Sequence, residues 1–418
     1  MRKNLSVCTP YPKWNRAEQE FRVWSESTYS DYMGEMNFFS LQKLAYYSQK
    51  TSGDCFALLP YDPRPGAPYD LRVQLIEADR VCNKDDAGDT DEIAGGIERD
   101  KDGKPVAIYI RTPHPGATYF SMLNTMPTWK RVPIFGARTG RRNIIHLKDV
   151  DRIGQSRGVP VLTPIIETLK QIGRYSEAEL AAAVVNSMLS VFVKRPIEGP
   201  SGMELHWLDE YEKRGEAPPW ENPLRFKLGN GTWIDGAPGE DLNVITAARP
   251  SSQFDPFQTA MIKQIGMALR LPMEILIQLF QSSYSASKAA FLAAQKTFEA
   301  ERDAFDFYFN QPIWEAWITE AVIKERLSAP GYLTNPAIRF YYSGAYWQTS
   351  EQNQIDETKE ATAANLRVEY GFSTRAREAA KLTGMSYADI VAAQAKEKEL
   401  AAKSGLLHGT AKPAKADV

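Results

Sequence analysis

A proline-rich segment between two stretches of helical pattern restricts, more than any other feature, what this chain can fold into. Residues 161–193 follow a nearly uninterrupted helical pattern, in which Pro164 is tolerated because it falls in the first turn. Helix returns at Asp255, which can act as a cap, with Pro256 at the first helical position. The stretch 194–252 between them is punctuated by Pro196, Pro200, Pro218, Pro219, Pro223, Pro238 and Pro250. The pattern predicts a compact β-rich insertion held between two helices.

The part of the chain before residue 160 shows mixed α and β patterns. An amphipathic helix is predicted over residues 38–47. Pieces rich in β-branched residues, separated by Pro- and Gly-rich turns, predict strands at 55–59, 71–76, 106–110 and 144–147.

The part after residue 272 is mainly helical in pattern. A long helix is predicted over 285–324, with a kink at Pro312 because a mid-helix proline removes a backbone hydrogen bond. A strand is predicted at 338–342. Helices should follow from about 356 to 402, divided at Gly371 and Gly384. The fold class predicted for the whole chain is α+β.

Composition argues against several classes of function. The 50 Lys and Arg residues balance 52 Asp and Glu residues, so the chain as a whole does not attract a polyanion. Its 3 cysteines are widely spaced, which makes a disulfide framework or a zinc site improbable and favours a reducing compartment. Neither a secretory leader nor a membrane-spanning run is visible.

The best candidate for an enzyme motif is Gly154-Gln155-Ser156-Arg157-Gly158, which matches the G-x-S-x-G pattern of serine hydrolases. In those enzymes the motif lies on a sharp turn between an apolar strand and a helix. Here the charged run 148–152 separates it from the nearest predicted strand. A glycine-flanked turn is therefore the favoured interpretation, and a hydrolase with Ser156 as nucleophile remains the alternative.

Other potential sites are weaker still. The four histidines, His114, His146, His206 and His408, lack metal-ligand spacing, and none has the Cys or Asp neighbour that a metal site requires. Arg138, Arg141 and Arg142 lie in a glycine-containing segment that lacks the phosphate-loop ending, so a solvated loop is favoured over a nucleic-acid contact. No catalytic residue, metal or cofactor is predicted.

Five further stretches carry recognisable motifs: 154–167, 175–183, 249–272, 284–290 with the later Pro312-Ile313-Trp314, and 356–374. In this order they resemble the lambda family of phage portal proteins. A weaker match at 24–44 extends the resemblance over nearly the whole chain.

The resemblance implies a ring of about twelve subunits. Each subunit would have an outer wing, a helical stem, a clip inserted between two stem helices, and a crown. The implied segments are a wing at 1–160, stem helix 1 at 161–193, a clip at 194–252, stem helix 2 at 253–272, a tunnel loop at 273–285, a kinked helix with a wing strand at 286–349, a crown at 350–405 and a disordered tail at 406–418. Related portals have a longer segment before the Trp24 region, so we expect a truncated start or a short member.

The resemblance also implies a function and partners. The ring would be the vertex channel of a virion, assembled in the host cytoplasm, through which double-stranded DNA is packaged and ejected. Its implied partners are the terminase large subunit, a head-completion or adaptor protein, and capsid and scaffold proteins, with no membrane. The residues assigned to the tunnel loop are Gln278, Leu279, Phe280, Gln281, Ser282, Ser283 and Tyr284.

We expect Lys170, Arg174 and Lys263 on the stem helices to make weak contacts with DNA phosphates. Weak contacts suit the task, since strong ones would add up over the ring and stop the DNA from sliding. An equally supported alternative is that these charges pair between subunits. A monomeric nucleic-acid-binding module is a third interpretation, but it would need a basic surface that the charge balance does not favour.

Overall fold

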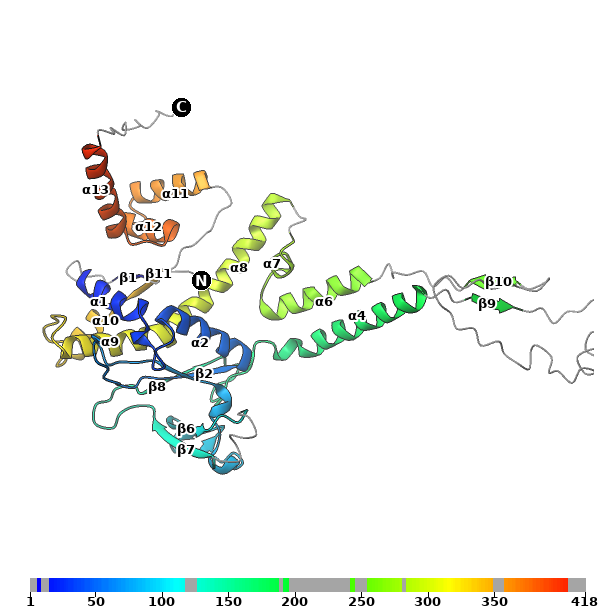
Figure 1. Cartoon of the computed structure of the whole chain (residues 1–418), viewed down its shortest axis with the longest axis horizontal. Helices are drawn as coiled ribbons and strands as arrows, with labels where there is room; N and C mark the ends of the chain where they lie inside the picture. The colour runs from blue at the N-terminus through cyan, green and yellow to red at the C-terminus, as the bar shows by residue number, and fades with distance from the viewer. Residues whose placement is uncertain are drawn as a thin grey trace, which may run out of the picture. The chain divides into compact units, whose positions relative to one another are not determined.

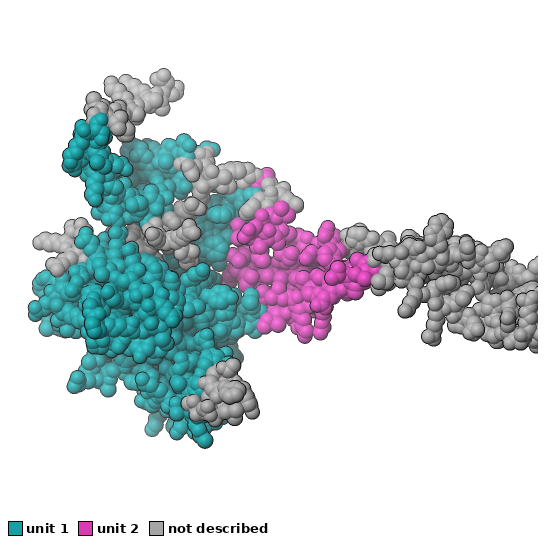
Figure 2. Space-filling model, in the orientation of Figure 1, with its two compact units in different colours: residues 1–163, 284–418 teal, residues 164–283 magenta. Residues whose placement is uncertain are grey.

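The computed structural model describes most of the chain outside the proline-rich segment. The described residues are 6–8, 15–116, 126–187, 191–194, 241–244, 254–279, 283–348 and 357–404. The chain forms two compact units, one made of Met1–Thr163 with Tyr284–Val418 and the other of Pro164–Ser283 (Figure 2). Unit 2 is therefore an insertion into the sequence of unit 1, and the fold is mixed α+β.

Aromatic side chains form the core of unit 1. The Phe21 ring packs edge-on against Trp314 and Trp317, with centroid distances of 5.1 Å to each, and against Phe38 at 6.0 Å. These rings come from three helices far apart in the sequence, so burying them fixes the N-terminal segment against the later helices. The helices are α1 (Asn15–Glu26), α2 (Phe38–Ser52) and α9 (Gln311–Ile323).

Two antiparallel sheets complete the N-terminal half of unit 1. The first has the order β3-β2-β8, and the second has the order β4-β5-β6-β7. Figure 1 labels β2 and β8 of the first sheet and β6 and β7 of the second. The strands are β2 (Asp54–Leu58), β3 (Gln74–Ile76), β4 (Ile93–Ala94), β5 (Ile97–Arg99), β6 (Pro105–Thr112), β7 (Thr128–Pro133) and β8 (Ile144–Lys148). The patterns at 55–59, 106–110 and 144–147 correspond to β2, β6 and β8, the end of the 71–76 pattern forms β3, and the 38–47 pattern lies within α2.

The long C-terminal helical pattern is interrupted by a π-helical turn. Helix α8 (Tyr284–Phe305) continues into this turn at Asp306–Asn310 and then into α9. Pro312, where we predicted a kink, lies in the first turn of α9, directly after the π turn. Figure 1 shows α8 and α9 running in different directions.

The strand predicted at 338–342 is wrong, because these residues lie in helix α10 (Pro336–Ser343). The Asn335 side chain accepts hydrogen bonds from the backbone N–H groups of Ala337 and Ile338, and Pro336 occupies the first turn. This N-cap and the first-turn proline favour a helix, although the β-branched and aromatic residues of the segment favour a strand. A short strand follows, β11 (Tyr346–Gln348), paired with β1 (Ser6–Cys8).

In unit 2 the first predicted helix is shorter than expected. A 3-10 turn at Thr163–Ile165 precedes α4 (Ile166–Ser187), and β9 (Val191–Lys194) occupies the end of the predicted 161–193 helix. The β-branched and aromatic run in β9 pairs antiparallel with β10 (Asp241–Val244). The remainder of the predicted insertion lies outside the described residues.

The second helix of unit 2 also ends early. Helix α6 (Phe254–Leu269) stops before Arg270, which has a left-handed φ of 56°. A short helix, α7 (Met273–Ile277), follows within the segment predicted as a loop at 273–285.

The C-terminal helices follow the sequence pattern. They are α11 (Glu357–Glu369), α12 (Arg375–Thr383) and α13 (Tyr387–Lys403), separated near Gly371 and Gly384 as predicted. Both glycines have the positive φ that favours glycine after a helix. The predicted tail at 406–418 lies outside the described residues. None of the described helices is both long and apolar enough to cross a lipid bilayer.

A prediction follows from the buried carboxyl group in the π turn. Asp306 is buried, and burial raises its pKa to about 6, although a hydrogen bond from Asn310 favours the ionised form. Because the pKa is higher in the folded than in the unfolded state, the ionised carboxylate destabilises the fold above pH 6. This penalty disappears as the pH falls below the unfolded value near 3.8.

We therefore expect Asp306→Asn to stabilise unit 1 at pH 8 by up to about 3 kcal/mol, and to have little effect near pH 4. Urea unfolding followed by tryptophan fluorescence would measure this difference. An equal effect at both pH values would contradict a raised pKa of Asp306.

Candidate functional site

Helices α4 and α6 lie side by side in unit 2, as Figure 1 shows. The ring of Tyr175 on α4 stacks on Phe254 at 5.6 Å between centroids and meets Phe257 at 4.4 Å. The half-buried residues of α4 recur at intervals of mostly three or four positions, as expected for one face of a helix. It consists of Thr168, Ile172, Tyr175, Ser176 and Glu179.

An apolar row on α4 remains exposed. Ile166, Leu169 and Leu180 are 56%, 43% and 68% exposed. Gly173 lies in the same row, so the spacing along the helix is three, four and seven residues. This spacing places the row on one side of the helix, distinct from the half-buried side that carries Tyr175.

The three basic residues predicted to face DNA are all exposed. Lys170 and Arg174 are four residues apart on α4, and the Lys170 ammonium lies 3.9 Å from the Glu167 carboxylate. Lys263 lies on α6. Only Lys170 and Arg174 therefore share one face of a helix.

The residues assigned to the tunnel loop, 278–284, begin directly after α7. Gln278 caps that helix with a left-handed φ of 54°, and the exposed Leu279 follows it. Ser283 precedes Tyr284, the first residue of α8. Phe280, Gln281 and Ser282 lie outside the described residues.

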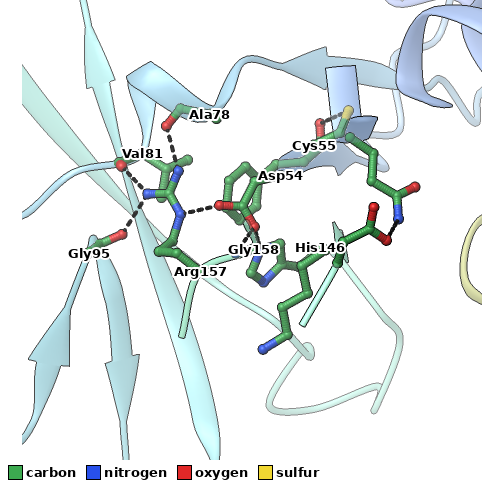
Figure 3. Close-up of polar contacts among 12 residues, drawn as sticks. Asp54, Cys55, Ala78, Val81, Gly95, His146, Arg157 and Gly158 are labelled. Atoms are coloured by element: carbon green, nitrogen blue, oxygen red, sulfur yellow. Dashed lines mark hydrogen bonds and ion pairs between the residues drawn. The ribbon is translucent and has the colours of Figure 1, made fainter. Parts of the chain in front are cut away.

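The glycine motif at 154–158 anchors the chain segment that precedes α4. Arg157 donates from Nε to the Asp54 carboxylate at 2.5 Å. Its two Nη atoms donate to three backbone carbonyls, those of Val81, Gly95 and Ala78, at 2.7 to 2.9 Å (Figure 3). One side chain thus joins β2, the segment after β3 and the turn between β4 and β5.

The carboxylate of Asp54 is the centre of this cluster. The residue is 2% exposed, and its Oδ1 accepts from His146 Nε2 at 2.7 Å and from the Gly158 N–H at 2.8 Å. Burial alone would raise the pKa of Asp54, but the hydrogen bonds from His146 and Arg157, together with the charge of Arg157, lower it overall. Burial lowers the pKa of His146 despite its contact with Asp54. We infer an ionised Asp54 paired with Arg157 and hydrogen-bonded to a neutral His146.

Two glycines allow the backbones to meet at this cluster. A Cβ added to Gly158 would lie 1.9 Å from the carbonyl oxygen of Gly53, a distance that no side chain could tolerate. Gly53 itself has a φ of 81° and ends α2. The segment entering unit 2 therefore lies directly on the end of α2.

Helix α2 also contacts α8, the first element after unit 2 in the sequence. The Lys50 ammonium lies 3.1 Å from Asp149 in the entering segment and 3.5 Å from Glu301 on α8. Tyr46 donates a short hydrogen bond to Glu301, and Gln49 donates to Asp149 at 2.7 Å. Helix α2 of unit 1 therefore contacts both the segment that precedes unit 2 and the helix that follows it.

These contacts do not support the serine-hydrolase alternative. Although Asp54 and His146 form a pair, no hydrogen bond joins Ser156 to His146 in the structure, where both residues are described. The motif supplies an arginine for structural anchoring, and its first glycine has the positive φ of a turn.

The remaining sequence candidates have structural roles or lie outside the described part. Two histidines have carboxylate partners that lie far from them in the sequence, since His146 meets Asp54 and His114 Nε2 lies 2.5 Å from Glu77. His206 and His408 are not described. Within the described ranges, no group of three or more His, Cys, Asp or Glu side chains could hold a metal ion.

The arginine-rich loop packs against the protein more closely than a solvated loop would. The Arg141 guanidinium lies 3.8 Å from the centroid of the Tyr61 ring and donates to the Leu59 carbonyl at 2.7 Å. Arg142 lies over the Phe135 ring at 4.9 Å, whereas Arg138 is exposed. These cation–π contacts account for two of the three arginines.

Comparisons with known proteins give one consistent result. The model of the family described as "Phage portal protein, lambda family" matches residues 9–302. Portal protein B of Escherichia phage lambda is 23% identical over 367 residues, which cover 83% of this chain and 66% of that protein. The portal protein of Escherichia phage N15 is 22% identical over 398 residues, covering 90% of this chain and 72% of that protein. This chain therefore spans about two thirds of the length of the first relative.

Two matches among solved structures come from gene transfer agent particles. A chain in the virion of the native particle gives a TM-score of 0.41 at 14% identity, covering 88% of this chain and 89% of that one. A chain in the neck of the native particle, computed with C12 symmetry, gives 0.40 at 12% identity, covering 90% and 91%.

The anchoring role of Arg157 can be tested by Arg157→Lys. Lysine keeps the charge but cannot reach Asp54 and three carbonyls at once, so we expect a loss of about 3 kcal/mol in the stability of unit 1. Hydrogen exchange of amides in residues 149–161 should accelerate. The matched control is Arg152→Lys, at an exposed position of the same segment. Equal effects of the two substitutions would contradict the anchoring role.

Proposed function

This chain belongs to the lambda family of phage portal proteins, and on that premise we propose that it forms a closed ring through which double-stranded DNA enters and leaves a virion. Membership makes the chain a structural, non-enzymatic component of the virion. Beyond membership, we propose the ring, its channel and its partners.

The single observation that carries the ring is the exposed apolar row of α4. A helix that only had to pack within its own subunit would need one packing face, and α4 already has one in the half-buried side that carries Tyr175. Leaving Ile166, Leu169 and Leu180 exposed to water is unfavourable, at roughly 25 cal/mol for each Å² of apolar surface. Contact with another subunit would remove this surface from water.

A cyclic ring requires that two different surfaces of each subunit meet. The exposed row of α4 supplies one such surface, and it is distinct from the face that binds α6. We assign α4 and α6 to the stem, the segment between them to the clip, α11 to α13 to the crown, and the sheets of unit 1 to the wing.

The polar side of α4 is suited to line the channel. Lys170 and Arg174 lie there four residues apart, and the carboxylate of Glu167 lies three residues before Lys170. The Lys170 ammonium is 3.9 Å from that carboxylate, which weakens its attraction to phosphates. DNA could therefore pass without being held at one position.

The loop after α7 would narrow this channel. Gln278 and Leu279 are exposed, and the side chains expected in the loop are mostly uncharged. Because the sequence has no nucleotide-binding motif, we propose that a terminase motor docks on the clip. A head-completion or adaptor protein would later take its place, and the capsid and scaffold proteins would contact the wing.

The ring proposal is tested by Leu169→Glu, which puts a charge into the exposed apolar row. We expect this variant to remain folded but to sediment as a monomer, because the buried charge would cost several kcal/mol at every subunit contact. Gln171→Glu, an exposed position two residues away, is the matched control and should assemble. Sedimentation velocity would separate the two, and rings formed by Leu169→Glu would rule out this row as a subunit contact.

The loop assignment is tested by the double substitution Gln278→Glu and Gln281→Glu. Negative charges facing DNA should reduce the packaged DNA per particle while leaving ring assembly unchanged. Gln394→Glu, on the exposed surface of α13, is the control for the change of residue type. Normal packaging by the double variant would show that the loop does not face DNA.

A further inference from the structure

The outer side of α6 presents a second exposed surface in unit 2. Four exposed residues lie three, one and three positions apart, so they share one side of the helix. They are Ala260, Lys263, Gln264 and Met267. Met267 is 73% exposed. The buried Ile265 and the half-buried Phe254 and Phe257 lie on other positions of the helix, with both rings against Tyr175 of α4.

Two opposite charges on these helices lack an ion-pair partner within the described part of the subunit. Lys263 on α6 forms no salt bridge there, and neither does Glu177 on α4, although both are exposed. Glu177 lies four residues after Gly173 and three before Leu180, at the edge of the exposed apolar row. Lys170, in contrast, has Glu167 on its own helix at 3.9 Å.

We propose that the exposed apolar row of α4 is covered by the outer side of α6 from the next copy of this chain, with Lys263 paired to Glu177 across the contact. The inference rests on the proposed ring and names the surface that completes it. Gly173 in the row and Ala260 on α6 are small, which permits close approach of the two helices. Met267 is unbranched and can fill the space between larger side chains.

Symmetry and charge both favour α6 over a second α4 as the occupant. Two identical rows packed on each other would give a two-fold dimer, whereas an α4 surface on an α6 surface repeats in one direction and can close into a ring. An α4–α4 contact would also leave Lys263, which lies on α6, without a partner of opposite charge. The α4–α6 contact brings the two together.

Charge reversal and its rescue test this contact. Lys263→Glu and Glu177→Lys should each weaken ring assembly about tenfold, measured as the protein concentration at which half of the chain sediments as rings. The double variant should return to within about twofold of the natural chain, because the pair is restored with its charges exchanged. Lys101→Glu, in an exposed turn of unit 1, controls for the change in net charge.

Three results would contradict the proposed α4–α6 contact while leaving the proposed ring intact. If both single variants assemble like the natural chain while Leu169→Glu does not, the α4 row is covered by something other than α6. If the double variant assembles no better than the single ones, Lys263 and Glu177 are not partners. If Lys263→Glu assembles normally but its particles retain less DNA, Lys263 faces the channel. Assembly of Leu169→Glu would instead refute the proposed ring contact.

Discussion

The burial of one negative charge organises unit 1. Asp54 is almost fully enclosed, and a carboxylate in that position is tolerated only with a cation and hydrogen-bond donors around it. Arg157 provides the cation, and through its remaining donors it binds three separate backbone segments. The chain that leads into unit 2 therefore has one favourable position on the surface of α2. Lys50 and Tyr46 on the same helix hold the chain that returns.

This arrangement suits a subunit that works by presenting a helical hairpin to its neighbours. The anchoring contacts lie in unit 1, where they hold both connections, while α4 and α6 are left with exposed apolar and charged surface. A protein that acted alone would have little reason to leave Leu180 and Met267 in water. The balanced net charge is consistent with this interpretation, since contacts between copies need complementary surfaces and a passing DNA duplex needs weak ones.

The sequence predicted well what depends on local patterns. The helices around Leu41, Tyr175 and Ile265, and the breaks near Gly371 and Gly384, follow from periodicity and from glycine. The strand at 338–342 was mistaken because its β-branched and aromatic residues were given more weight than the cap at Asn335. The role of Arg157 could not be seen at all, because its partner Asp54 lies 103 residues away in the sequence. The family resemblance marked that motif as important, but only the fold shows that its arginine, and not its serine, makes the contacts.

The central claim is that the exposed apolar row of α4 lies between subunits. Hydroxyl-radical footprinting of the unaltered chain, at concentrations below and above assembly, would measure this directly because leucine side chains react according to their exposure. Leu169 and Leu180 should become several-fold less reactive in the assembled form, while Leu279 at the loop should keep its reactivity. Unchanged reactivity of both α4 leucines in assembled particles would contradict the claim.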